Sequence, residues 1–285
     1  MLGRQTTGSV VCVSCGYLVG VKDDRCYNCG RRNPGLWGYA SAVRRLGSDL
    51  GFVPFVIGLC VVMYALTLIG SRGNIGRASL FGLLSPSSTS LLLFGASGAV
   101  PVFLLDRWWT VLSAGWLHGG LLHIFFNLYW VRQLAPAVSD LYGPGRLVII
   151  YTVAGVAGFV LTTLAGGYLQ FIPIAALRGA TITVGASASI FGLLGALVYY
   201  GRRTGSSRTY SVALQYAAIM FLFGFIMPGI DNYAHLGGFL GGYAASQMLD
   251  PMTPERINHM VWALVCIAVS VLSIVVSVVH GLMLG

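Results

Sequence analysis

Charged side chains are scarce in this sequence. Only 9% of its 285 residues are Asp, Glu, Lys or Arg, 56% are hydrophobic, and the mean hydropathy is +0.79. An ordinary soluble domain carries about 25% charged residues, so this composition excludes one. None of the 8 acidic residues falls within the longest apolar runs. The chain is therefore predicted to be an all-α protein that crosses a membrane several times.

The apolar residues gather in runs of membrane-spanning length, which is about 20 residues for a helix. Transmembrane helices are predicted at 52–69, 112–135, 147–169, 185–200, 211–227, 233–249 and 260–283. The first run is too late in the chain and too long to be a secretory signal peptide. We divide the chain into an N-terminal module (1–35), a basic linker (36–51), a six-span core (52–250) and an additional seventh span (251–285).

Positive charge is unevenly distributed between the two sides of this topology. All Lys and Arg residues except Arg72, Arg77, Arg107 and Arg178 precede the first run or lie in or beside alternate connections. Cytoplasmic flanks retain Lys and Arg, so the N-terminus is predicted inside and, after an odd number of spans, the C-terminus outside. The net charge of +9 then reflects this topology and contact with anionic lipid, and nothing indicates a nucleic-acid partner.

Cysteine is also sparse, and four of the six residues form two C-x-x-C motifs ten residues apart: Cys12, Cys15, Cys26 and Cys29. Four thiolates at this spacing favour a tetrahedral zinc site, and a reducing cytosolic location argues against disulfides. A four-ligand site has no open position for catalysis, so the zinc is expected to be structural. The module is either purely structural or a docking site for a cytosolic protein. Cys60 and Cys266 lie inside predicted spans and are interpreted as apolar packing.

Two serines between small residues are candidate nucleophiles. Ser187 follows Gly185 and Ala186 and opens an apolar helix, a position that exposes a hydroxyl. Ser97 lies in a Gly-Ala-Ser-Gly sequence in the long connection before the second span, in a segment (91–103) that we expect to lie in or dip into the outer leaflet. Because Ser97 opens no membrane helix and precedes Pro101, Ser187 is the preferred nucleophile.

Polar side chains inside membrane spans are costly and usually functional. His123 and Asn127 are four residues apart and share a helical face, and His235 lies near the start of the sixth predicted span. In the predicted topology these residues and Ser187 all occur early in inward-running helices, so they share one depth in the outer half of the bilayer. His118 is interpreted as a hydrogen-bonded residue that holds the loop.

These residue types favour acyl transfer to water. A neutral imidazole can take a proton from a serine hydroxyl, which assigns Ser187 as nucleophile and His235 as base. Asp231, at the outer edge, is interpreted as too exposed to orient His235, so we expect a dyad that needs no acid and no catalytic cofactor. Asn127, His123 and the Ser187 backbone N–H are the candidate oxyanion donors.

The sequence resembles the rhomboid family of intramembrane serine proteases over roughly residues 50–250. The matching segments are Trp116 to Asn127 with both histidines, Gly185 to Ser187 with Phe191 to Gly195, and Ala234 to Gly238. The resemblance implies a six-helix bundle, the roles assigned above, and cleavage of single-span membrane proteins near the outer face. A mobile fifth span or the loop before the sixth would act as the gate. Two positions depart from the family pattern, with Ala188 replacing a glycine and Thr110 an arginine.

Two other functions compete with the protease. An inactive rhomboid-like scaffold would bind membrane helices, but the nucleophile and base are both present. A transporter would line a path with polar groups, whereas here they stop halfway and no acidic residue lies in any span. Alone, Ser187 reads as a helix-packing residue and His235 as a satisfied core histidine, and their shared depth favours catalysis. The expected location is a bacterial inner membrane.

Overall fold

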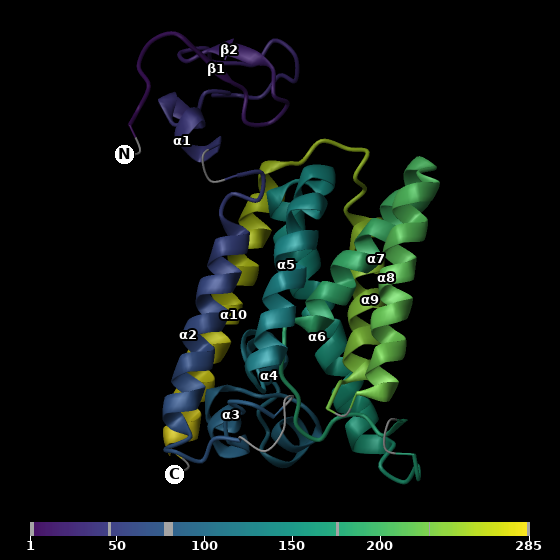
Figure 1. Ribbon diagram of the computed structural model, residues 1–285. Coiled ribbons are helices and arrows are strands. Elements are labelled where there is room, and N and C mark those ends of the chain that lie inside the picture. The colour runs from purple at the N-terminus through teal and green to yellow at the C-terminus, as the bar shows by residue number, and fades with distance from the viewer. Residues whose placement is uncertain (1–2, 45–46, 77–81, 175–176, 228, 284–285) are drawn as a thin grey trace.

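The structure is a computed structural model that describes residues 3–44, 47–76, 82–174, 177–227 and 229–283 (Figure 1). Arg77 and parts of the 36–51 and 251–285 ranges lie outside these residues. The chain forms a small N-terminal module and a helical bundle, and the module and the C-terminus lie at opposite ends of the bundle (Figure 1).

The N-terminal module is built on a two-stranded antiparallel sheet. Strands β1 (Ser9–Val11) and β2 (Leu18–Gly20) pair with Val10 opposite Val19. A 3₁₀ turn, η1 (Leu36–Gly38), and helix α1 (Ala40–Arg44) follow. The module has its own core, which consists of Val10, Cys12, Val19, Val21, Cys26 and Ala40.

In the described part of the chain, seven long helices form the bundle: α2 (Phe52–Gly70), α5 (Leu121–Tyr142), α6 (Pro144–Tyr168), α7 (Ser187–Thr204), α8 (Ser207–Ile226), α9 (Asn232–Met248) and α10 (Ile257–Met283). Helices α2, α6, α8 and α10 are each long and apolar enough to cross a membrane. Helices α7 and α9 are shorter and less apolar, with 18 and 17 residues, and many of their side chains are buried inside the bundle. The chain is thus an all-α membrane protein with a six-helix bundle, a seventh C-terminal helix and a four-cysteine knuckle.

The second span begins later than its predicted start at residue 112. Residues before it form α4 (Thr110–Ser113) and the 3₁₀ turn η3 (Ala114–Trp116), and the chain then bends by 93° into α5. Gly119 and Gly120 lie in the break, where glycine's low helix propensity favours interruption. The predicted leaflet segment contains parts of α3 (Ser88–Phe94) and η2 (Val100–Leu104), a π-helical turn.

Glycines let α7 pack closely against its neighbours. A Cβ atom on Gly192 would collide with the Ala154 side chain of α6, and one on Gly195 would collide with the Phe239 carbonyl of α9. A Cβ on Gly242 would likewise meet the backbone of Gly192. Small residues that allow backbones to approach are the usual basis of helix association in membranes. The contacts place α7 and α9 side by side, in parallel, with both helices starting at the same end.

Two buried arginines hold α10 against the core at its two ends. Near the C-terminus, Arg107 donates to the carbonyl oxygens of Leu92 (2.6 Å) and Ser277 (2.8 Å). At the other end, Arg146 donates to the Thr253 carbonyl (2.8 Å) and to Nδ1 of His259 (3.2 Å). Burial raises the pKa of the nearby Glu255 carboxyl, although that group accepts a hydrogen bond from the Arg146 backbone N–H (2.9 Å). The seventh helix is therefore an integral part of the bundle.

Candidate active site

Ser187 is the first residue of α7, and an extended segment leads the chain into it. Thr183 and Ser97 exchange backbone hydrogen bonds of 2.7 and 3.1 Å, and the Gly185 N–H donates to the Ala114 carbonyl (3.0 Å). Gly185 has a φ of +130°, a conformation that side chains rarely adopt. The segment is thus fixed on both sides, and it leaves Ser187 partly exposed.

His235 lies one turn into α9, and Asp231 caps that helix. The Asp231 carboxylate accepts hydrogen bonds from the Ala234 N–H (3.0 Å) and from the Thr162 hydroxyl of α6 (2.8 Å). The prediction that Asp231 is too exposed to act is therefore wrong in its premise, because the residue is partly buried and one carboxylate oxygen is fully buried. Its observed role is to fix the start of α9 rather than to bond the imidazole.

Contacts between α7 and α9 place the His235 ring against Phe191, one helical turn after Ser187. The His235 ring stacks on Phe191, with ring centroids 4.1 Å apart and an interplanar angle of 15°. Phe191 is four residues after Ser187, so the two share one face of α7. Among the described residues, no hydrogen bond joins the Ser187 hydroxyl to the imidazole, and His235 Nδ1 is buried without a partner.

His123 and Asn127 lie one turn apart near the start of α5. The Gly119 N–H donates to His123 Nδ1 (3.2 Å), which in the neutral ring leaves the proton on Nε2. A Cβ atom placed on Gly185 would lie 2.6 Å from His123 Nε2, so this nitrogen faces the segment that leads into Ser187. Asn127 Nδ2 donates to the His123 carbonyl (2.8 Å), and Asn127 is 5% exposed.

The interpretation of His118 as a hydrogen-bonded loop residue finds no protein partner for its ring within the described residues. His118 is fully buried, and neither of its ring nitrogens has a partner in the described part of the chain. Its ring instead meets that of His123 edge to face, with centroids 5.3 Å apart. His118 lies in the break before α5, so helical spacing in the sequence does not predict its neighbours. Its contact with the His123 ring depends on the bend between η3 and α5.

Ser97 and Ala188 have roles in packing and in holding loops. Ser97 is fully buried, and its hydroxyl lies 3.2 Å from that of Thr110, the residue that replaces the expected arginine. Ala188 is 1% exposed and fills the space left by Gly158 of α6, where an added Cβ would lie 2.6 Å from the Ala188 methyl.

The four N-terminal cysteines form a compact cluster. Their sulfur atoms all lie within 4.8 Å of one another, with Cys12 and Cys29 at 3.8 Å and Cys15 and Cys26 at 3.6 Å. Four sulfurs bound tetrahedrally at about 2.3 Å from a metal would be separated by about 3.8 Å, so the geometry fits. Burial and the neighbouring thiols raise the pKa of the Cys29 thiol, and a bound cation would favour its thiolate form.

The two cysteine turns share one backbone pattern. The Gly16 N–H donates to the Cys12 carbonyl (3.0 Å), and the Gly30 N–H donates to the Cys26 carbonyl (2.9 Å). Both glycines have positive φ angles. In both motifs, the sequence indicates this turn by the glycine four residues after the first cysteine of the pair.

The fold and site define a polytopic membrane protein with Ser, His and Asn side chains gathered at one end of its buried helices. The Rhomboid domain family model matches residues 105–251. Rhomboid protease GluP of Bacillus subtilis (strain 168) is 30% identical over 168 residues, covering 58% of this chain and 30% of GluP. RHOMBOID-like protein 4 of Arabidopsis thaliana is 30% identical over 165 residues, covering 56% of this chain and 39% of that protein.

The chain belongs to the Rhomboid family. The relatives include a protein named as inactive, the Inactive RHOMBOID-like protein 8 of Arabidopsis thaliana, which is 27% identical over 218 residues, covering 69% of this chain and 58% of that protein. The family therefore contains both proteases and inactive members, and this chain spans less than two thirds of the length of these relatives.

Proposed function

We propose that this protein is an intramembrane serine protease that cleaves transmembrane substrates with Ser187 and His235. The observation that carries the proposal is the stacking of the His235 ring on Phe191, one turn from Ser187 on the same face of α7. An imidazole beside a serine hydroxyl is the minimal arrangement for nucleophilic catalysis by serine.

The reaction is acyl transfer to water. His235 takes the proton of the Ser187 hydroxyl as Oγ attacks the scissile carbonyl, and it returns that proton to the leaving amine as the peptide C–N bond breaks. Water then attacks the acyl-enzyme with the same assistance, which releases the new carboxyl terminus and restores the hydroxyl. No metal or organic cofactor enters these steps.

Three donors would stabilise the oxyanion formed in each step. The Ser187 N–H is at the first turn of α7, where backbone N–H groups have no partner within the helix. His123 contributes Nε2–H, whose direction the Gly119 hydrogen bond fixes, and Asn127 contributes its amide. Removing one oxyanion donor typically costs about 100 to 1,000-fold in rate.

The site would open toward the outer face and admit substrate from the lipid beside α8. Ser187, His235 and His123 all lie on first turns at the bundle end opposite the N-terminal module, which is the outer end if the N-terminus is cytoplasmic (Figure 1). Of the four helices that are long and apolar enough to cross a membrane, α8 is the least buried. It contacts α5 through the rings of Tyr216 and Trp130, whose centroids are 5.4 Å apart. Separation of α5 and α8 would give a single-span substrate lateral access to Ser187.

The N-terminal cysteine cluster is proposed to bind zinc on the cytosolic side of a bacterial inner membrane. An all-thiolate tetrahedral set is the donor chemistry of structural zinc sites. The ion would stabilise the small module, whose core contains only six buried residues. Its distance from the bundle end that carries Ser187 supports a structural or protein-docking role (Figure 1).

The proposed nucleophile is tested with the purified full-length protein and a single-span model substrate. Ser187→Ala is expected to abolish cleavage, because Ser187 is the hydroxyl-bearing residue one turn before Phe191, on which the His235 ring stacks. Ser97→Ala is the matched control and is expected to retain activity, since Ser97 is buried against Thr110. Loss of cleavage in Ser97→Ala alone would overturn the assignment, and an inactive wild-type protein would favour the inactive-scaffold alternative.

The direction of the His123 side chain is tested by Gly185→Ala. The added methyl would lie 2.6 Å from His123 Nε2 and would strain a residue at φ +130°, so it should displace the ring. We expect kcat to fall about 10-fold or more with a smaller change in KM, because an oxyanion donor acts mainly in the transition state. Gly58→Ala, at a position with open space around it, is the control. Unchanged kcat in Gly185→Ala would exclude this role for His123.

Metal content tests the cysteine cluster. Full-length protein purified under reducing conditions is expected to carry zinc, and Cys12→Ser combined with Cys26→Ser should lose it, whereas Cys266→Ser should not. Chelation of the zinc should leave cleavage of a model substrate in detergent largely intact, because the ion takes no part in the reaction. Protein without bound zinc under these conditions would contradict the assignment.

A further inference from the structure

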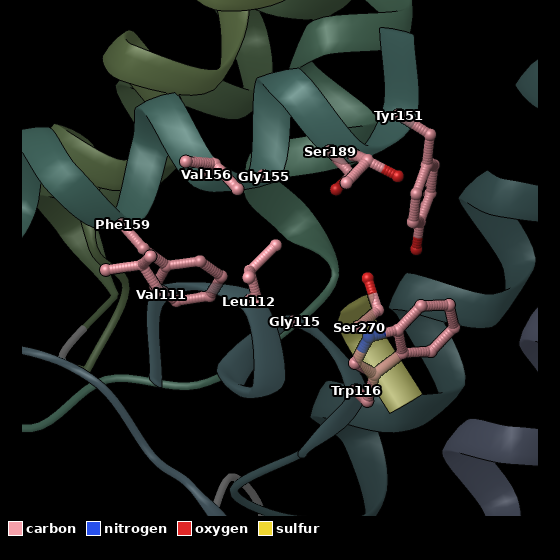
Figure 2. Close-up of a pocket in the computed structure, with 11 residues that line it drawn as sticks. Val111, Leu112, Gly115, Trp116, Tyr151, Gly155, Val156, Phe159, Ser189 and Ser270 are labelled. Carbon is pink, nitrogen blue, oxygen red and sulfur yellow. The ribbon is translucent and has the colours of Figure 1, made fainter. Parts of the chain in front are cut away.

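A small cavity, partly open to the outside of the bundle, lies between the helix that carries Ser187 and the seventh helix. The volume of this cavity is about 20 Å³. Residues of four segments line it, namely α4 with η3, α6, α7 and α10 (Figure 2). Most of the lining is apolar, but one side carries the hydroxyl groups of Tyr151, Ser189 and Ser270.

The Tyr151 hydroxyl makes no hydrogen bond of ordinary length and angle in the described part of the protein, although the residue is only 4% exposed and the Ser189 side chain lies close enough to interact with it. Figure 2 shows the oxygens of Tyr151 and Ser270 directed into the same space, with Ser189 beside the Tyr151 ring. Ser189 and Ser270 are 4% and 3% exposed. Buried hydroxyls are almost always hydrogen-bonded in native proteins, so this group calls for a polar ligand.

The cavity is the right size for one water molecule. Holding a water requires roughly 10–15 Å³ of such volume and two to four polar partners, and both conditions are met. We propose that one ordered water molecule binds to Tyr151, Ser189 and Ser270 and joins α6, α7 and α10.

This water site is separate from the catalytic site. Ser189 is two residues after Ser187, so its side chain leaves α7 about 200° around the helix axis from that of Ser187. The ligand is therefore a structural water behind the nucleophile rather than the hydrolytic one. Gly155 keeps the space open, because a Cβ atom there would lie 2.7 Å from Ser189 Oγ. The bound water would make the seventh helix a support for the start of α7.

Thermal unfolding of Tyr151→Phe distinguishes a hydrated cavity from a dry one. In a hydrated cavity the substitution removes a hydrogen bond and should lower the unfolding midpoint by about 2–4 °C. In a dry cavity it removes an unpaired buried hydroxyl, so the midpoint should rise. The measurement is made in the Ser187→Ala background, so its outcome does not depend on proteolytic activity.

Ser270→Ala should lower the midpoint in the same way, because it removes a second ligand of the water. Ser273→Ala is the comparison on the same helix: it removes the hydrogen bond from the Ser273 hydroxyl to the Ser270 carbonyl (2.7 Å), and its effect on the midpoint should simply add to that of Tyr151→Phe, whereas the effect of Ser270→Ala should not. A crystal structure at about 2 Å resolution should contain a water peak within hydrogen-bonding distance of all three hydroxyls. A raised midpoint in Tyr151→Phe, or a direct Tyr151–Ser270 hydrogen bond with no water peak, would overturn the proposal.

Discussion

The close approach of α7 to α6 and α9 is the constraint on which the rest of the structure depends. Without side chains at Gly192, Gly195 and Gly242, the backbones of α7 and α9 come into contact and fix the two helices in parallel register. That register stacks His235 on Phe191 and so brings the imidazole beside the turn that begins with Ser187. A bulkier residue at any of these glycines would separate the helices and with them the two candidate catalytic groups.

The surrounding loops and the seventh helix support this register from the bundle end at which α7 and α9 begin. Ser97 pairs with Thr183 in the extended segment that leads into Ser187. Arg107, which follows Ser97 in the same connection, donates a hydrogen bond to α10. Within the described residues, buried polar atoms of His118, Asn127 and His235 lack protein partners, and these three residues lie at this end. Buried polar groups without partners are expensive in a packed membrane bundle, and water that enters the proposed site would bind them.

Much of this arrangement could be predicted from sequence, because lipid imposes simple rules on helix length and charge. The seven apolar runs, the four cysteines and the shared face of His123 and Asn127 all follow from local spacing. The start of the second span could not be predicted, since apolar residues continue through the bend at Gly119 and Gly120 and hydropathy does not register it. The contacts of His118, the cap formed by Asp231 and the cavity at Ser270 depend on residues far apart in the chain. The position of Phe191 on the same helical face as Ser187 could be predicted from their spacing of four residues. Its stacking on His235 could not, because the two residues are far apart in the chain.

Covalent labelling tests the central claim most directly, namely that the His235 imidazole activates the Ser187 hydroxyl. A fluorophosphonate reacts with a serine whose proton a neighbouring base removes. After treatment of the purified full-length protein, mass spectrometry of its peptides is predicted to find the adduct on Ser187, and replacement of His235 by Ala should abolish it. An adduct on Ser97, labelling of Ser187 that persists without His235, or no labelling of the wild-type protein would contradict this account.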